Sequence, residues 1–229
     1  MAENDTPGTG IALGVIFVGA AALCILAAGL LLAPLLILGG SGLGSGGAYT
    51  GPIPHGTTTQ NVLYWRSVAC AEAAKYKPWN QTTPQFVNAV DAIMTQESGG
   101  NPNAYSYAGA EGLMQVLPDK LTEIGWYGSP FDPKENIAAG ENYLRYLFET
   151  YYQRGGLAAV AAGYNGGDGG ALAYLQCGMP CVAGYSGQTY DYVLAVQANY
   201  KAYSALPQGA CGAEAPSKKS GSGKGTLAP

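Results

Sequence analysis

Glu97 stands where a carboxyl group could act as a general acid. The residues before it repeat at helical spacing and predict a helix over residues 83–98 with one apolar face. The apolar residues of that face are Phe86, Val87, Val90, Ile93 and Met94. Glu97 follows Val90 by seven residues and Met94 by three, so it projects from the same face. Burial there would disfavour the charged form and raise the pKa of the carboxyl group, which suits a general acid at neutral pH.

The helix that would carry Glu97 has clear start and stop signals. Thr83 offers a hydroxyl N-cap, and Pro84 suits the first helical position. Gly99-Gly100 would end the helix directly after the glutamate. On this pattern alone, Glu97 could equally be a helix-end glutamate that reaches solvent, so its neighbours along the chain must decide.

Three short segments follow one another around Glu97 in a fixed order. Residues 96–103 read QESGGNPN, residues 112–115 read GLMQ and residues 163–165 read GYN. In this order they resemble the catalytic signature of the soluble lytic transglycosylase family, whose lysozyme-like domain cuts the glycan strands of peptidoglycan. The resemblance extends over residues 84–203, about half of the chain. One departure is Gly163, where the family usually has alanine.

The resemblance implies roles for individual residues. Glu97 would be the general acid and then the base, and Ser98 would help to hold the substrate's acetamido sugar. The full set of implied substrate-binding residues is Ser98, Met114, Gln115, Tyr164, Asn165 and Tyr192. Among these, the Tyr192 hydroxyl would point toward the catalytic carboxyl. Because the substrate's own groups complete the reaction, the resemblance calls for no protein nucleophile, no metal and no cofactor.

Packing alone could also explain several of these side chains. A methionine such as Met114 is more often a core residue than a cleft residue. Tyr164 follows Val160 by four residues and Leu157 by seven, as a core residue of a helix would. Tyr192 likewise belongs to an apolar stripe. Packing does not explain why all of them occur in this order around one glutamate.

The predicted fold is mainly α: a lysozyme-like helical domain over residues 61–211, preceded by a single transmembrane helix. Strand signals are scarce, and some 150 residues after the linker suffice for one domain. The helices expected in the domain cover residues 61–76, 83–98, 119–124, 132–155, 157–164 and 190–203.

The N-terminal region predicts a membrane anchor. Residues 6–65 contain no Lys, Arg, Asp or Glu, and residues 11–38 are almost wholly apolar. As a helix these residues would span ~42 Å, more than the ~30 Å of bilayer hydrocarbon. A cleaved signal peptide would need a basic start, but residues 1–10 carry Glu3 and Asp5 and no basic residue. We therefore expect a retained single-pass anchor, with the catalytic domain outside the cytoplasm in the cell envelope, where peptidoglycan lies.

The segments that flank the anchor and the domain have linker and tail compositions. Residues 1–10 form a short N-terminal tail, and residues 39–60 form a glycine-rich linker. Residues 212–229 form a basic tail of the kind that stays disordered. Such a tethered enzyme could serve a conjugation or secretion apparatus, wall turnover, or a bacteriophage, including one with a membrane in its virion.

Composition argues against several other classes of protein. Charged residues make up 11% of the chain, the formal net charge is −4, and no basic stripe is present, so nucleic acid is not an expected partner. The one histidine, His55, lies in the predicted linker. A serine-histidine triad within the domain is therefore excluded, and a zinc amidase is not expected.

The cysteines suggest disulfides. Cys24 lies in the apolar segment, and the other four cysteines allow three pairings. Cys177 and Cys181 could close a tight loop, and Cys70 and Cys211 would then join the two ends of the domain. Disulfides at both pairs would agree with an exported domain.

Two other functions compete with the lytic transglycosylase. A goose-type lysozyme would hydrolyse the same bond, but it would need a second carboxylate to position water. The candidates are Asp91, Glu111, Asp168 and Asp191. A non-catalytic glycan-binding protein of the envelope or virion is the other alternative, and the glutamate at position 97 argues against it.

Overall fold

The computed structural model describes residues 47–207 and Cys211, and these residues form helices joined by loops. In chain order the helices are α1 (Thr58–Tyr76), α2 (Thr83–Glu97), α3 (Pro118–Glu123), α4 (Pro133–Leu147), the π-helical turn η1 (Phe148–Tyr152), α5 (Gln153–Cys177), α6 (Met179–Tyr185) and α7 (Gly187–Ser204). The mainly helical fold expected from the sequence is confirmed for this part of the chain.

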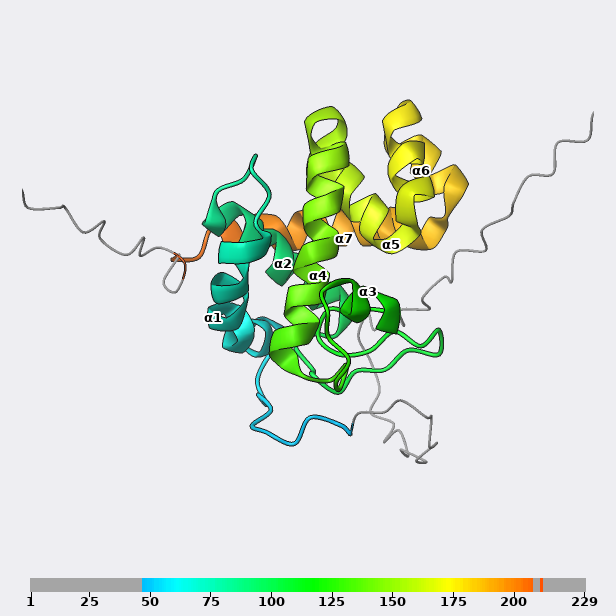
Figure 1. Cartoon of the computed structure of the whole chain (residues 1–229). Coiled ribbons are helices and arrows are strands. Elements are labelled where there is room, and N and C mark those ends of the chain that lie inside the picture. Colours follow the sequence, from blue (N-terminus) through cyan, green and yellow to red (C-terminus); the bar gives the residue numbers. More distant parts are fainter. Residues whose placement is uncertain (1–46, 208–210, 212–229) are drawn as a thin grey trace, which may run out of the picture.

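Helix α4 stands at the centre of the domain (Figure 1). Helices α1 and α2 lie on one side of it, α5 and α6 lie on the other, and α7 runs across behind. One continuous core of buried apolar side chains joins these helices. The residues of α2 from Phe86 to Met94 are all buried, so the helix that ends at Glu97 is enclosed by its neighbours.

Helix α2 begins at the predicted Thr83, but its N-cap lies one residue earlier than the sequence signals predict. The N-cap is Thr82, whose hydroxyl accepts a hydrogen bond from the Gln85 backbone N–H. The Gln85 side chain in turn accepts from the Thr82 backbone N–H, which completes a capping box. Pro84 therefore lies in the first turn of the helix rather than at its first position.

Helix α1 begins at Thr58, three residues before the predicted position. The chain just before it also packs on the domain, because Tyr49 exchanges two hydrogen bonds with the Asn103 side chain. Trp65 of α1 donates its indole N–H to the carbonyl of Gly100 at 2.9 Å. The C-terminal end of the predicted linker, residues 39–60, thus overlaps the folded domain.

The predicted helix stop at Gly155-Gly156 coincides with a break in the helical backbone. The helical path runs from α4 through η1 into α5, and Gly156 and Gly167 inside α5 have non-helical backbone, with φ values of 60° and 63°. The predicted helix over residues 157–164 is the middle stretch of α5. The last stretch of α5 and all of α6 were not predicted, because their small residues and glycines give no clear helical periodicity.

The predicted membrane anchor at residues 11–38 lies outside the described residues. The predicted tails at residues 1–10 and 212–229 also lie outside them. Within residues 47–207, every helix is too short or too polar to cross a membrane.

Both predicted cysteine pairs are disulfide-bonded in the structure. The Cys70–Cys211 bond ties α1 to the segment that follows α7, and the Cys177–Cys181 bond joins the end of α5 to α6. The first bond links residues 141 positions apart, so it joins the two ends of the described domain.

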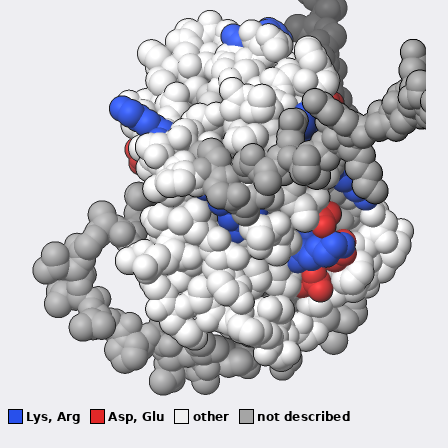
Figure 2. Space-filling model, turned by 90° about the vertical axis from the view of Figure 1, so that its left-hand side faces the viewer, with Lys and Arg blue, Asp and Glu red and all other residues white. Residues whose placement is uncertain are grey.

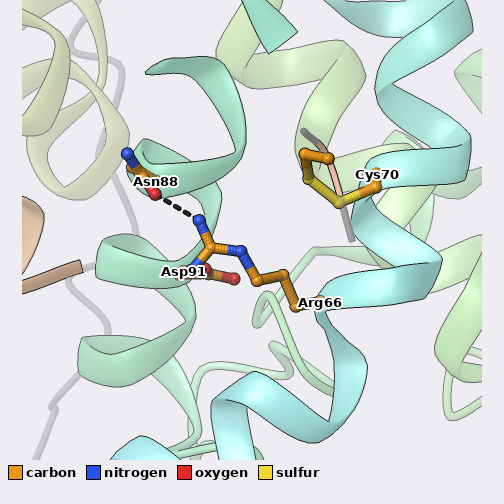
Figure 3. Close-up of a disulfide and its surroundings, with 5 residues drawn as sticks. Arg66, Cys70, Asn88 and Asp91 are labelled. Carbon is orange, nitrogen blue, oxygen red and sulfur yellow. Dashed lines mark hydrogen bonds and ion pairs between the residues drawn. A yellow bond between two sulfur atoms is a disulfide. The ribbon is translucent and has the colours of Figure 1, made fainter. Parts of the chain in front are cut away.

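A buried ion pair fixes α1 against α2. Arg66 of α1 reaches Asp91 of α2 with an N–O distance of 3.3 Å and donates a further hydrogen bond to the Asn88 side chain (Figure 3). Figure 3 also shows that the Cys70 disulfide lies one turn further along α1. The Asp91 side chain has no exposed surface, and Arg66 is 5% exposed. Asp91 therefore holds the helix that carries Glu97.

The surface carries few charges. On the face shown in Figure 2, Lys and Arg are scattered, and one basic group is flanked by acidic side chains. This face agrees with a chain in which only 11% of residues are charged.

Replacing Asp91 should destabilise the domain strongly. Asp91→Ala would leave Arg66 buried without its carboxylate, and breaking a buried ion pair in this way costs about 3–5 kcal/mol. Burial raises the pKa of Asp91 to about 7, against the opposing effect of Arg66, so urea denaturation should be measured above that pH. The control is Lys134→Ala, which removes an exposed ion pair with Glu135 and should change stability far less. Equal effects of the two substitutions would contradict the role given to Asp91.

Candidate active site

A cleft of about 620 Å³ opens beside the end of α2, with Glu97 in its wall. Side chains from the loop after α2, from α3, α4 and α5, and from the start of α7 complete the lining. Among the described residues that line this cleft, the acidic side chain is that of Glu97.

Glu97 is half-buried and held by one short hydrogen bond. It is the last residue of α2, and the Tyr192 hydroxyl of α7 donates to its Oε1 at 2.5 Å. Burial raises the pKa of Glu97 to about 7, although the bond from Tyr192 lowers it. Near neutral pH the carboxyl group is therefore close to its midpoint and can both give and take a proton.

The loop between α2 and α3 is held close to Glu97 by the side chain of Asn136. Its Oδ1 accepts from the Met114 backbone N–H at 2.7 Å, and its Nδ2 donates to the carbonyls of Glu111 and Pro130. Gly112 makes this approach possible: it has φ 76°, and an added Cβ would lie 2.3 Å from Asn136 Nδ2.

Gln115 lines the cleft in a conformation that costs energy. Among the described residues, Gln115 is the non-glycine residue whose φ is positive, at 47°. Its Nε2 donates to the carbonyls of Ala104 and Gly112, at 3.0 and 3.1 Å, which holds the backbone in place. The amide nitrogen is thus engaged by the loop, and the side-chain oxygen is the polar atom left for a ligand. Backbone outliers of this kind concentrate at functional sites.

Tyr164 and Asn165 of α5 form the opposite wall. The Tyr164 hydroxyl donates to the Met114 carbonyl at 2.9 Å, and the Asn165 side-chain oxygen accepts from the Thr189 hydroxyl at 2.9 Å. These bonds join α5 to the loop and to α7 across the cleft. They also fix the orientation of both side chains.

Four of the seven residues expected at the site line the cleft: Glu97, Gln115, Tyr164 and Asn165. The other three support them. Ser98 donates to the Leu113 carbonyl at 2.7 Å, Met114 is fully buried beneath the loop, and Tyr192 is 5% exposed and bonded to Glu97. The sugar contacts expected from Ser98 and Met114 stay predictions, and in the structure both residues support the loop beside the cleft.

Further lining residues were not predicted from the sequence. They include Lys120 of α3, Tyr185 at the end of α6 and Gln188 at the start of α7. Ser186, the N-cap of α7, was a usable signal, because a serine before a helical stripe places the next residues at a helix start. Lys120 reaches the cleft only because α3 packs on α4.

Gly163 shows why the chain departs from the usual alanine. An added Cβ would lie 2.8 Å from Leu147 Cδ2 and 3.3 Å from the Ala171 Cβ. The close packing here also lets the Tyr143 hydroxyl donate to the Gly163 carbonyl at 3.1 Å. The missing methyl group therefore reflects tight packing behind the cleft.

None of the four carboxylates proposed to assist Glu97 lines the cleft. Asp91 is buried against Arg66, and Asp168 accepts hydrogen bonds from Tyr146 outside the cleft. Asp191 is exposed on α7. Glu111 is half-buried in the loop, where burial raises its pKa.

The described residues thus form a helical domain with one half-buried acid in the wall of a cleft. Residues 77–176 match the family model described as "Transglycosylase SLT domain". This part of the chain is thus similar to the transglycosylase domain of that family.

Curated relatives agree with this family. The matched region is 37% identical over 93 residues to the soluble lytic murein transglycosylase of Escherichia coli (strain K12), covering 37% of this chain and 14% of that protein. It is 41% identical over 98 residues to the membrane-bound lytic murein transglycosylase C of Edwardsiella ictaluri (strain 93-146), covering 35% of this chain and 27% of that protein. The chain thus matches between about a seventh and a quarter of the length of these relatives.

Solved structures of such enzymes are also similar to this chain. The complex of the 70-kDa soluble lytic transglycosylase with bulgecin A is 28% identical, with a TM-score of 0.47, over 63% of this chain and 24% of that one. An inactive mutant of the lytic transglycosylase Slt from Pseudomonas aeruginosa is 22% identical, with a TM-score of 0.49, over 60% of this chain and 23% of that one.

The raised pKa of Glu97 makes the stability of the domain depend on pH. Its folded-state pKa of about 7 exceeds the ordinary 4.5, so the folded state favours the protonated form, and stability is lost as pH rises through 7. Glu97→Gln should therefore be more stable than the wild type above pH 7, by at most about 3 kcal/mol, at ~1.4 kcal/mol per pKa unit.

Urea denaturation below pH 4.5 and above pH 7 measures this difference. Glu149→Gln, which removes one exposed carboxylate from η1, is the matched control. A stability gain for Glu97→Gln that is the same at both pH values would show that Glu97 is not shifted by burial.

Tyr192→Phe should raise the pKa of Glu97 above 7. The substitution keeps the ring and removes the one donor that stabilises the charged carboxylate. Titration of the glutamate carboxyl carbon by NMR measures the pKa directly. Tyr190→Phe, in the same helix, is the control for loss of a hydroxyl group. An unchanged or lowered pKa in Tyr192→Phe would refute the proposed effect of the hydrogen bond.

Proposed function

We propose that this domain is a peptidoglycan lytic transglycosylase that cleaves the β-1,4 bond between N-acetylmuramic acid and N-acetylglucosamine. The observation that carries the proposal is the half-buried Glu97 carboxyl in the cleft wall, with a pKa of about 7 and one hydroxyl donor. The family match supports the class of substrate.

The reaction would proceed in two proton transfers through one residue. Protonated Glu97 gives its proton to the glycosidic oxygen, the bond from that oxygen to C1 of the muramoyl sugar breaks, and the bonding electrons leave with the oxygen. The substrate's acetamido group stabilises the positive charge left at C1. The Glu97 carboxylate then takes the proton of the muramoyl 6-hydroxyl while O6 bonds to C1, which closes a 1,6-anhydro ring and returns Glu97 to its protonated form.

The geometry supports a single-carboxylate mechanism over hydrolysis. An inverting hydrolase needs a second carboxylate about 6.5–9.5 Å away, with water between the two groups. The described residues that line the cleft offer only Glu97. An attacking hydroxyl that already belongs to the bound sugar needs no such partner, because intramolecular attack carries an effective molarity on the order of 10⁵ M or more.

The location of the domain follows from the proposed substrate. We infer that residues 11–38 anchor the protein in the membrane and that the domain works outside the cytoplasm, where the glycan strands lie. A role in conjugation, secretion or phage entry, with the anchor in a virion membrane as an alternative, is compatible with such a tethered enzyme. One curated relative is named as membrane-bound, which supports an envelope location.

The reaction products test the proposal. Wild-type protein should digest purified peptidoglycan to muropeptides that end in 1,6-anhydro-N-acetylmuramic acid, lighter by one water than hydrolysed ends, and mass spectrometry reads this difference. Glu97→Gln should lose about 10²–10⁴-fold in rate or more, because one residue serves both steps. Its thermal unfolding should stay cooperative.

Predominantly reducing ends would instead identify a lysozyme. Near-wild-type turnover in Glu97→Gln would show that Glu97 is not the general acid and base. Binding to peptidoglycan without any cleavage would identify a glycan-binding protein.

A further inference from the structure

The chain just before α1 lies along the domain as a strap. Residues 47–57, here called the strap, contain neither helix nor strand and run below α1 toward the loops of the domain (Figure 1). At one end of the strap, the Ser129 hydroxyl donates to the Gly47 carbonyl at 2.8 Å. At the other end, the Gly56 backbone N–H donates to the Asn61 side chain at 2.7 Å. The strap is therefore bound to the domain at both of its ends.

The middle of the strap is bound by Asn103, which lies in the loop after α2. The Asn103 side chain accepts from the Tyr49 backbone N–H at 2.7 Å and donates to the Tyr49 carbonyl at 3.0 Å. One side-chain amide thus bonds both backbone polar groups of one strap residue. The Tyr49 ring also packs edge-on against Trp65 of α1, with 5.9 Å between the ring centroids. These contacts hold the strap, α1 and the loop together.

Asn103 stands next to the residue that holds Gln115. The carbonyl of Ala104 accepts from the Gln115 side-chain Nε2 at 3.0 Å and from the Gly112 backbone N–H at 2.8 Å. Both bonds support the positive-φ backbone of Gln115 in the cleft wall. Asn136 holds the same loop at the Met114 backbone. The loop beside the cleft thus has two supports, one from α4 and one from the strap.

We propose that the strap is a positioning element for substrate binding, because it fixes Asn103 and Ala104 and, through them, the Gln115 side chain in the cleft wall. The inference rests on the proposed function in that the cleft binds a glycan. No strap residue lines the cleft, so the strap acts only through the loop. The predicted linker, residues 39–60, therefore meets the domain at a contact that also shapes the substrate site.

The strap and the catalytic acid have separate supports. Glu97 is held by the Tyr192 hydroxyl of α7, and none of the contacts of the strap involves either residue. Release of the strap should therefore weaken the binding of substrate by Gln115 and leave the proton transfers of Glu97 as they are. This separation predicts a change in KM without a change in kcat.

Asn103→Ala tests the inference in the full chain, because it removes both bonds to Tyr49. On soluble glycan strands, KM should rise about three- to tenfold, the equivalent of one net hydrogen bond, while kcat and its pH profile stay at the wild-type values. In an amide hydrogen-exchange experiment, the Gly112 N–H should exchange about tenfold faster, because its acceptor at Ala104 is no longer held.

Asn80→Ala is the matched control. Asn80 is also a part-buried loop asparagine whose side chain donates to a backbone carbonyl, that of Phe148 at 3.4 Å, and it lies in neither the strap nor the cleft lining. It should leave KM and the exchange of Gly112 at the wild-type values.

Tyr49→Pro releases the same contact from the side of the strap, because proline has no backbone N–H and lacks the ring. It should raise KM in the same direction as Asn103→Ala. The double variant should be no worse than Asn103→Ala alone, since both substitutions break one contact. Fully additive effects would show that Asn103 acts without the strap.

A wild-type KM in Asn103→Ala would overturn the inference, also where kcat alone falls, as a loss of folded protein would produce. Wild-type exchange at Gly112, or equal changes in Asn80→Ala and Asn103→Ala, would overturn it as well. If the wild type cleaves no glycan, the proposed function fails. The exchange of Gly112 then decides alone whether the strap positions the loop, because that measurement needs no substrate.

Discussion

The hydrogen bond from Tyr192 to Glu97 joins α7 to the end of α2 at the point where the cleft opens. A second contact between the same helices, from Thr95 to the Tyr203 hydroxyl at 2.8 Å, fixes their register. On the other side of α2, Asp91 is held by Arg66 of α1. Helix α2, which ends at Glu97, is thus fixed from both sides. The Glu97 carboxyl group therefore stays half-buried and remains in the wall of the cleft.

This placement has an energetic cost that other parts of the domain must offset. A carboxyl group with a pKa of about 7 lowers the stability of the folded state once it ionises. The loop beside it adds the strained backbone of Gln115. The offsetting contributions are the buried core, the three hydrogen bonds that Asn136 makes to the loop region, and the disulfides that close the domain.

Local patterns predicted the parts of the site that lie within single segments of the chain. The helical spacing before Glu97 and the segments around residues 112–115 and 163–165 were enough to find the acid and two walls of the cleft. The parts that depend on how helices pack were not found. Arg66 was not recognised as the partner of Asp91. The hollow of about 470 Å³ beside Arg145, which adjoins the cleft, forms only because α3, α4 and α5 meet there. Helix α6 was missed because its short sequence has no apolar stripe.

Glu141 shows what helical spacing alone does not tell. It lies four residues after Ile137 and three before Leu144, so it falls on the apolar stripe of α4 just as Glu97 falls on that of α2. It is fully buried, and burial, with the nearby Glu72 and Asp91, raises its pKa well above the ordinary value.

The difference between the two acids lies in their surroundings. The oxygens of Glu141 have no hydrogen-bond donor among the described residues, and the residue lines neither the cleft nor the hollow. A carboxyl group in that position favours its protonated form and has no access to the cleft. Glu97 has a side that is open to the cleft and accepts a hydrogen bond from a hydroxyl that stabilises its charged form, and its pKa is about 7. Burial makes both groups weak acids, but only the combination of burial, access and one donor makes a residue that can give a proton and then take one back.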